Sequence, residues 1–454
     1  MENPLVTEPI PRLVRRIAVP ASIGFFFNTM FNVVDTYFAG LISTEALAAL
    51  SLSLPVFFIL LAVGSGISTG TTALIANSLG AGRRKEARLL ALQGISYGFL
   101  VSIVLSVFGL LCSPFLFRVL GASQGYLAMV STYMDTLFFG SVFFVTLYML
   151  SGLLNSLGET KPFRNFLIAG FLLNILLDPW FLYGGLGVPA MGLMGIALST
   201  VLIQAGGCLY LAFKVKATGL LAGGESKMAF PRMVPFLEIS RQGLPACVNM
   251  LTVGMGIFVI TYFVSRFGKD AVAAYGTAMR VEQMVLVTTI GLNVATLTLV
   301  AQNHGAGLYR RIRETIRTSL LYGGLLMLAG SILVFFLAGP LMSLFSADRR
   351  VVETGAVYLR IDALVLYAYV ILFVYVSALQ GMKRPLYAML IGLWRQIVAP
   401  LLLFWLLTEA MGFGILGIWW GIFGITWSAA LFTLFYASLV LKKMDRPSHG
   451  HSDH

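Results

Sequence analysis

Residues 13–40 read LVRRIAVPASIGFFFNTMFNVVDTYFAG, a long apolar run that starts among arginines and carries one acidic residue, Asp35. About 20 apolar residues suffice for a helix to cross the hydrocarbon core of a bilayer. Comparable runs follow along the whole chain, at 46–79, 89–112, 123–152, 163–183, 190–213, 236–265, 271–303, 314–338, 351–380, 386–407 and 412–441. Because strands of a membrane barrel alternate over only about ten residues, these near-continuous runs predict an all-α polytopic membrane protein with twelve transmembrane helices.

The composition of the 454-residue chain supports this class and excludes others. Hydrophobic residues make up 58% and charged residues 11%, with a mean hydropathy of +0.88, whereas soluble domains are about 45–50% apolar and 25% charged. A soluble enzyme, a disordered protein and a nucleic-acid binder are therefore excluded. The sequence also lacks a phosphate loop, an H-E-x-x-H motif and a nucleophile elbow in an α/β context, so we predict no enzymatic activity and no cofactor.

The positions of the basic residues predict the orientation. Most of the 31 lysines and arginines fall at the chain ends and in the loops on one side of the predicted spans. Cytoplasmic loops carry this excess in membrane proteins. An even number of spans then places both termini in the cytoplasm, and we expect a multi-pass protein of a bacterial or archaeal inner membrane.

The chain repeats itself at an offset of 225 residues. Leu79-Gly-Ala-Gly82 recurs as His304-Gly-Ala-Gly307, and Pro20 maps onto Pro245. Each half holds six spans, so we expect two pseudo-symmetric six-helix lobes in parallel orientation, which is typical of transporters with a substrate path between the halves. The predicted organisation is an N-terminal lobe, a cytoplasmic linker, a C-terminal lobe and a cytoplasmic tail, at residues 1–216, 217–235, 236–441 and 442–454.

Asp35 is the clearest candidate for a functional group. An ionisable side chain inside the bilayer costs at least ~2.5–3.5 kcal/mol and therefore faces the protein interior. Asn28 and Asn32 stand seven and three residues before Asp35, so all three share one face of the helix. We expect this face to border a cavity.

Asp178 is the second candidate, with Asn174 one turn earlier on the same helix face and Thr200 in the next span. These oxygens suit a hard monovalent cation such as sodium, or a carboxylate that carries a proton. Since two ionised carboxylates repel each other, we hypothesise that the Asp35/Asp178 pair titrates in the working pH range. The alternative for Asp178 is a position near the outer interface, where it caps a helix end.

The two halves differ at these positions. Ile260 matches Asp35, and the stretch that matches Asp178, around residues 400–403, is apolar. The second half instead carries Glu282 and Asp362, together with three intramembrane arginines, Arg280, Arg360 and Arg395. One interpretation is a set of ion pairs that holds helices together; the other is that the acids face the cavity and attract a cationic substrate.

Pro20 lies inside the first predicted span. Proline removes a backbone hydrogen bond and permits a kink in a membrane helix. We expect a kinked first helix that bends as Asp35 changes protonation, with a static kink as the alternative.

Several sequence motifs together resemble the multidrug and toxic compound extrusion (MATE) family, and within it the prokaryotic DinF-like branch. These are Asn32-Val-Val-Asp35, Ala46-Leu-Ala-Ala-Leu50, Gly80-Ala-Gly82, Leu173-Asn-Ile-Leu-Leu-Asp178-Pro179 and Ala301-Gln-Asn-His-Gly-Ala-Gly307. The resemblance implies a monomeric export pump with two six-helix lobes arranged in a V. It implies exchange of cationic or amphiphilic compounds for protons or sodium ions.

The resemblance to DinF-like members also implies a coupling site in the first lobe. The matching positions are Asp35, Asn174, Asp178 and Thr200, with Tyr133 nearby. Ser151 replaces an asparagine that some members carry, which favours protons over sodium. The expected cavity residues are Asn28, Asn32, Tyr37, Ser151, Glu282 and Asp362, of which the last two match the second-lobe acids of NorM-type members.

The function predicted from these features is secondary active efflux of small-molecule drugs and cations in exchange for protons, with sodium as the alternative ion. A lipid-linked precursor flippase of the same superfamily is one rival, and it requires basic residues in the cavity. A passive channel or scaffold is the other, and it requires no buried carboxylates.

Overall fold

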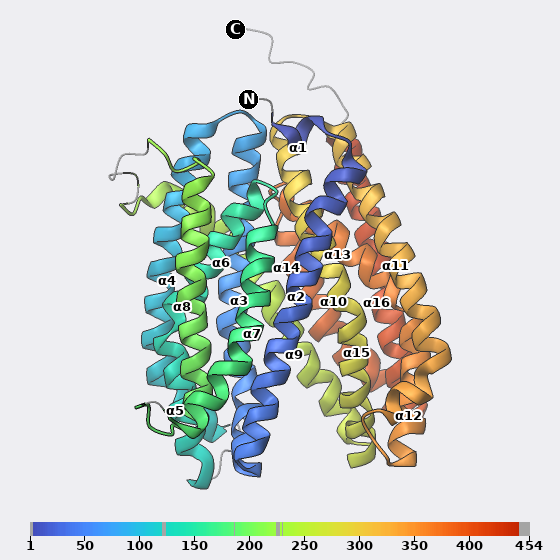
Figure 1. Cartoon of the computed structure of the whole chain (residues 1–454). Helices are drawn as coiled ribbons and strands as arrows, with labels where there is room; N and C mark the ends of the chain where they lie inside the picture. Colours follow the sequence, from blue (N-terminus) through green and yellow to red (C-terminus); the bar gives the residue numbers. More distant parts are fainter. Residues whose placement is uncertain (1–2, 120–123, 186, 224–227, 229, 445–454) are drawn as a thin grey trace. The chain divides into compact units, whose positions relative to one another are not determined.

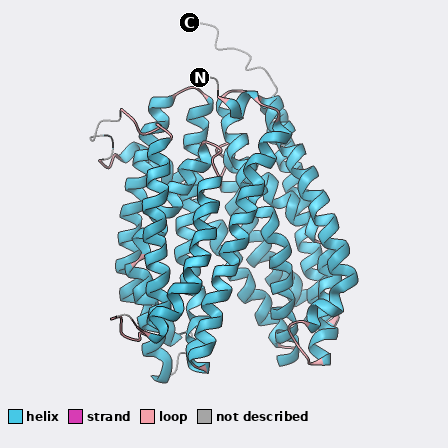
Figure 2. Cartoon of the chain, viewed as in Figure 1, coloured by secondary structure: helices cyan, strands magenta, loops and turns pink. Residues whose placement is uncertain are grey.

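The computed structural model describes residues 3–119, 124–185, 187–223, 228 and 230–444. Helices make up nearly all of this part of the chain (Figure 2). Among the described residues, ten helices are long and apolar enough to cross a membrane, and two bent helix pairs add one span each if each pair is counted as one. The predicted all-α fold with twelve spans is therefore confirmed.

The helices, labelled in part in Figure 1, have the following bounds: α1 Pro4–Thr7, α2 Ile10–Ile42, α3 Thr44–Gly80, α4 Arg84–Val119, α5 Gln124–Phe139, α6 Ser141–Ser156, α7 Lys161–Tyr183, α8 Leu193–Ala217, α9 Met233–Ser265, α10 Lys269–Gly305, α11 Tyr309–Ser343, α12 Arg349–Ala363, α13 Leu366–Gly381, α14 Leu386–Leu393, η2 Trp394–Val398, α15 Ala399–Trp405, η3 Leu406–Ala410 and α16 Gly414–Met444. The segments η2 and η3 are π-helical turns that run on from α14 and α15.

The repeated Gly-Ala-Gly motif makes the same turn in both halves. Gly82 after α3 and Gly307 after α10 have φ angles of 73° and 70°, a left-handed conformation that glycine adopts without steric cost. The backbone amide of the residue after each glycine reaches back to the helix, from Arg83 to Ser78 at 2.9 Å and from Leu308 to Asn303 at 2.8 Å. These bonds satisfy carbonyl groups at the helix ends.

Two of the predicted spans are broken rather than straight. Residues 127–139 and Ser141–Ser156 meet at 46°, and α12 and α13 meet at 50°. The first break is at Gly140, where an added Cβ would lie 2.4 Å from Val201. At the second, the freed carbonyls of Ala363 and Leu364 accept hydrogen bonds at 2.6 and 3.0 Å from Ser331 and Trp427. The two breaks are separated along the chain by the repeat offset of about 225 residues, so both halves share this feature.

The chain forms two compact units whose boundaries differ from the predicted lobes. The first-half unit comprises residues 19–251, and the second-half unit comprises residues 1–18 and 252–454. In the second-half unit, Leu13 and Ile17 of α2 cluster with Leu292 of α10. The 33-residue length of α2 allows its first turns to pack in one unit and the rest in the other. The helix continues through Pro20, which is next to this boundary.

The start of α9 packs in the first-half unit in the same way. The hydroxyl groups of Ser240 in α9 and Tyr97 in α4 are 2.7 Å apart. The backbone of Cys247 lies so close to α3 that an added Cβ on Gly66 would be 2.4 Å from its nitrogen. Small residues at membrane helix contacts allow this close approach of backbones. The linker predicted at residues 217–235 separates the two sequence repeats. The two packed units instead divide after residues 18 and 251.

A candidate ion-coupling site and its cavity

Three helices of the first-half unit bring the predicted polar residues together. Asp35 comes from α2, Asn174 and Asp178 come from α7, and Thr200 comes from α8. The side-chain amide of Asn174 donates a hydrogen bond to Oδ1 of Asp35 at 2.9 Å. Asp35 is 7% exposed, while Asn174 and Asp178 are fully buried. The spacing of four residues in α7 places both of its polar groups on one face, as expected.

Ser199 completes the cluster, and sequence reasoning missed it. Its hydroxyl donates a hydrogen bond to Oδ1 of Asp178. The only signal was its position next to Thr200, whose own hydroxyl donates to the carbonyl of Ile196 at 3.0 Å. Asp178 lies inside α7 and bonds to a neighbouring helix, so the alternative of an interfacial helix cap is wrong.

The cluster retains acceptor atoms that no described residue satisfies. Oδ1 of Asn174 and Oδ2 of Asp178 are buried and have no hydrogen-bond partner in the described part of the chain. The salt bridges found there do not include Asp35 or Asp178. Buried polar groups are normally paired. Unsatisfied oxygens beside two carboxylates form a set that can accept a proton or a small cation.

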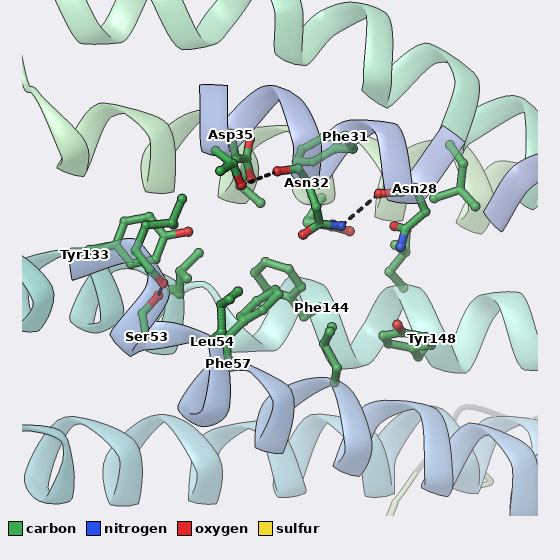
Figure 3. Close-up of a pocket in the computed structure, with 18 of the residues that line it drawn as sticks. Asn28, Phe31, Asn32, Asp35, Ser53, Leu54, Phe57, Tyr133, Phe144 and Tyr148 are labelled. Carbon is green, nitrogen blue, oxygen red and sulfur yellow. Dashed lines mark hydrogen bonds between the residues drawn. The ribbon is translucent and has the colours of Figure 1, made fainter. Parts of the chain in front are cut away.

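The cluster opens onto a small cavity of about 80 Å³ in the same unit. Figure 3 shows Asp35, Asn32 and Asn28 along α2, opposite Tyr133 and Phe144. The residues that line it are Asn28, Phe31, Asn32, Asp35, Thr36, Leu50, Ser53, Leu54, Phe57, Leu61, Tyr133, Leu137, Phe144, Leu147, Tyr148, Phe163, Leu167, Thr200 and Gln204. This lining is largely apolar and aromatic and contains no lysine or arginine, so it favours a positive charge over a negative one.

Not every predicted cavity residue lies there. Asn28 and Asn32 do, and the amide of Asn32 donates to the carbonyl of Asn28 at 2.8 Å. Tyr37 is outside the lining and 61% exposed, because two residues past Asp35 a helix has turned by about 200°. Ser151 is also outside the lining and is buried in α6. The cavity beside Asp35 therefore includes neither of them, and their place in a substrate path stays a prediction.

Glu282 and Asp362 belong to the second-half unit and do not line the cavity beside Asp35. The hydroxyl of Tyr358 donates to Oε2 of Glu282 at 2.8 Å. Asp362 is 1% exposed, and neither of its carboxylate oxygens has a hydrogen-bond partner in the described chain. Tyr358 is the repeat equivalent of Tyr133, so each unit holds buried acids and a tyrosine.

The ion pairs expected around these acids are not found. No salt bridge of the described residues joins Glu282 or Asp362 to an arginine. Arg280 and Arg360 have exposed side chains, and the guanidinium of Arg395 lies 5.4 Å from the centre of the Tyr369 ring. The described residues thus show no direct ion pair at these acids, and the interpretation of this set as paired charges that hold helices together stays a prediction.

Comparison with known proteins agrees with the fold and the repeat. The MatE family model matches residues 20–180 and again residues 245–405, two segments separated by the predicted offset of 225. The chain is 27% identical over 447 residues to a probable multidrug resistance protein NorM of Thermotoga maritima, covering 96% of this chain and 95% of that protein. It is also 27% identical over 402 residues to an FAD transporter of Shewanella oneidensis, covering 87% and 88%.

Among solved structures, a MOP superfamily transporter from Pyrococcus furiosus superposes with a TM-score of 0.92 at 21% identity, covering 98% of this chain and 99% of that chain. This likeness shows a shared fold along nearly the whole length. Because the family model covers both halves of the chain at equivalent positions, the protein belongs to the MATE family of membrane transporters.

Proposed function

We propose that this transporter exports cationic or amphiphilic small molecules from the cell in exchange for protons, and that Asp35 and Asp178 carry the coupling ion. The relative from Thermotoga maritima is named for multidrug resistance. We expect the protein to be a monomer in the plasma membrane with both termini in the cytoplasm, in agreement with its multiple spans and its charge distribution.

The observation that carries the proposal is the pair of buried carboxylates linked through Asn174. Two unpaired negative charges in a low-dielectric interior cost several kcal/mol each. No basic side chain lines the cavity to compensate them. Uptake of one cation from the cavity removes one of these two charges, and this need for a cation couples the cluster to an ion gradient.

Competition for Asp35 explains how the exchange proceeds. The ionised carboxylate attracts a cationic compound into the cavity. Once a proton neutralises the Asp35 carboxylate, that attraction is lost and the compound leaves. Only one of the two cations is held at a time, which is the requirement for antiport.

A proton fits the oxygen set better than a sodium ion. Sodium needs several oxygen ligands around one point, whereas the hydroxyl of Thr200 is directed to the backbone carbonyl of Ile196 in its own helix. A proton needs only one carboxylate oxygen and its acceptor, and two oxygens in the cluster have no other partner. Sodium remains the alternative ion that the experiment below tests.

The movement that accompanies neutralisation involves α2 in this proposal. Asn174 ties α2 to α7 through Asp35, and the strength of this bond changes with the charge of the carboxylate. The buried Pro20 interrupts the hydrogen-bond ladder of α2, so the helix can bend there.

The rivals differ in testable ways. The relative from Shewanella oneidensis is named for transport of FAD, an anionic dinucleotide, and a lipid-linked precursor also carries phosphate. Both need basic groups at the binding site, but the cavity beside Asp35 has none in its lining. A channel or scaffold gives no gradient-driven accumulation.

The test is uptake of tetraphenylphosphonium into proteoliposomes under an imposed proton gradient or an imposed sodium gradient. One pH unit supplies about 1.4 kcal/mol per proton, or about tenfold accumulation. We expect the proton gradient alone to drive uptake and Asp35→Asn to abolish it. The matched control is Asp135→Asn, an intramembrane acid of the same unit that accepts a hydrogen bond from Ser113 at 2.9 Å and does not line the cavity. Uptake driven by the sodium gradient alone refutes the assignment of protons as the coupling ion. Equal loss of uptake in Asp35→Asn and Asp135→Asn refutes the assignment of Asp35 to the coupling site.

A further inference from the structure

A second hollow lies between α7 and α8 of the first-half unit, apart from the cavity beside Asp35. The two helices run side by side (Figure 1). The hollow is a groove of about 480 Å³, lined by Asn165, Phe166, Ala169, Gly170, Leu173, Leu177, Leu202, Ile203, Gly206, Gly207 and Tyr210. It shares no residue with the cavity lining. Leu173 and Leu202 are 45% and 46% exposed, so the groove is open to the outer surface of the helix pair.

Glycines create this groove. A Cβ added to Gly206 would meet no atom within 4 Å, so the space beside it is open. At Gly207 an added Cβ would lie 2.2 Å from the ring of Phe166, which therefore occupies the space above that glycine. The groove thus has a smooth floor in α8 and an apolar wall in α7.

The length of the groove matches one leaflet of a bilayer. From Asn165 to Leu177 it follows α7 for about 18 Å at 1.5 Å per residue. One leaflet contributes about 15 Å to the hydrocarbon core. An acyl chain lying along α7 therefore fills the groove from the membrane surface to the midplane.

The surface end of the groove is positively charged. Arg164 donates to Oδ1 of Asn165 through Nε at 3.1 Å and Nη2 at 2.7 Å. The ammonium group of Lys214 lies 5.5 Å from the centre of the Tyr210 ring. Asn165 and Tyr210 both line the groove, and the lining contains no acidic residue. Two cations thus flank the end at which a lipid headgroup would lie.

The second-half unit has a groove at the equivalent place, between α14–η2 and α16. Its lining shares positions with the first groove at the repeat offset of 225, namely the pairs Asn165 and Leu390, Phe166 and Ile391, Ala169 and Trp394, Ile203 and Ser428, and Gly207 and Phe432. Basic residues again follow its surface end, with Lys442 and Lys443 closing α16. The same feature is thus built twice from different side chains.

We propose that the α7–α8 groove binds an anionic phospholipid of the cytoplasmic leaflet, with an acyl chain in the groove and the phosphate between Arg164 and Lys214. Basic residues at a membrane surface attract anionic lipids, and buried methylene groups add affinity. The same two helices carry Asn174 and Ser199 on their inner side, so the bound lipid stabilises the spacing of the helix pair that holds the cluster. The lipid site stands independently of the proposed ion coupling.

The first test counts bound lipids by native mass spectrometry of the full chain with phosphatidylglycerol or phosphatidylcholine. We expect the wild type to prefer phosphatidylglycerol. Arg164→Gln combined with Lys214→Gln should weaken its binding about 25-fold, about fivefold for each charge removed, and leave phosphatidylcholine unchanged. The charge-matched control is Arg84→Gln with Lys85→Gln, at the start of α4, which should bind both lipids as the wild type does.

The second test fills the groove. Gly206→Leu has space for its side chain and should lose one bound lipid of either kind, whereas Gly276→Leu, also at a glycine with no atom near an added Cβ, should lose none. Equal affinity of the wild type for the two lipids overturns the headgroup assignment. The groove assignment is overturned if Gly206→Leu keeps as many bound lipids as Gly276→Leu.

Discussion

The contact between α3 and α9 leads to the sharpest structural prediction. An added Cβ on Gly66 would lie 2.4 Å from the backbone nitrogen of Cys247 and 2.6 Å from its Cα. One turn later, a Cβ on Gly70 would lie 2.5 Å from the nitrogen of Gly243. Backbone atoms cannot rotate aside, unlike the end of a side chain. Gly66→Ala must therefore push the two helices apart.

The size of the effect follows from these distances. Carbon atoms at rest lie about 3.5–4.0 Å apart, so one methyl group at Gly66 requires a separation of roughly 1 Å or more. Overpacking of this kind costs about 1–3 kcal/mol. At about 2–4 °C per kcal/mol for a unit of this size, we expect Gly66→Ala to lower the melting temperature by roughly 2–12 °C.

The assay is thermal unfolding of the detergent-solubilised chain at a fixed scan rate. Gly206→Ala serves as the control, since an added Cβ there meets nothing within 4 Å and alanine favours the helix by about 0.5–1 kcal/mol over glycine. This control should melt at or slightly above the wild-type temperature. If Gly66→Ala melts together with Gly206→Ala, the close contact between α3 and α9 is wrong.

Three further predictions concern the two units separately. Glu282→Gln should retain most proton-driven uptake while Asp35→Asn loses it. Loss in both variants would show that a second-half acid is also required. Ser68→Ala with Thr72→Ala removes two hydrogen bonds from α3 to α6 carbonyls, at 2.6 and 3.0 Å. At about 0.6 kcal/mol for each bond, the melting temperature should fall by a few degrees. An unchanged melting temperature would show that these bonds contribute nothing to stability. Arg311→Gln removes the 2.6 Å bond to a carbonyl of the first residues of the chain, so hydrogen exchange of residues 4–9 should accelerate, and an unchanged rate would contradict this anchoring.

The twelve spans could be predicted because each depends on local composition. A helix that crosses a bilayer must satisfy its own backbone and present apolar side chains along about 20 residues. Both properties are visible in a single stretch of sequence. The repeat was visible for a related reason, since the turns at Gly82 and Gly307 both need a glycine.

The candidate site could be predicted only in part. Asp35 and Asp178 stand out as charges in apolar runs, and their amide neighbours share a helix face. Ser199 carries no such signal, because serine is unremarkable in a membrane helix until its partner is known. Tyr37 and Ser151 lie outside the cavity beside Asp35 for the converse reason: their chemistry suits a cavity, but the rotation of each helix decides which side chains face it.

The sequence by itself determined which segments enter the membrane, where the chain repeats, and which buried charges need a partner. Each of these follows from the free-energy cost of exposing polar groups to lipid. For each segment, this cost depends on the composition of that segment itself. Tertiary structure alone decided that the first turns of α2 and of α9 pack outside their own half, that two spans break, and that Asp35 meets Asn174 at 2.9 Å. These outcomes depend on how neighbouring helices fit against one another, a property of pairs of surfaces that no single stretch of residues contains.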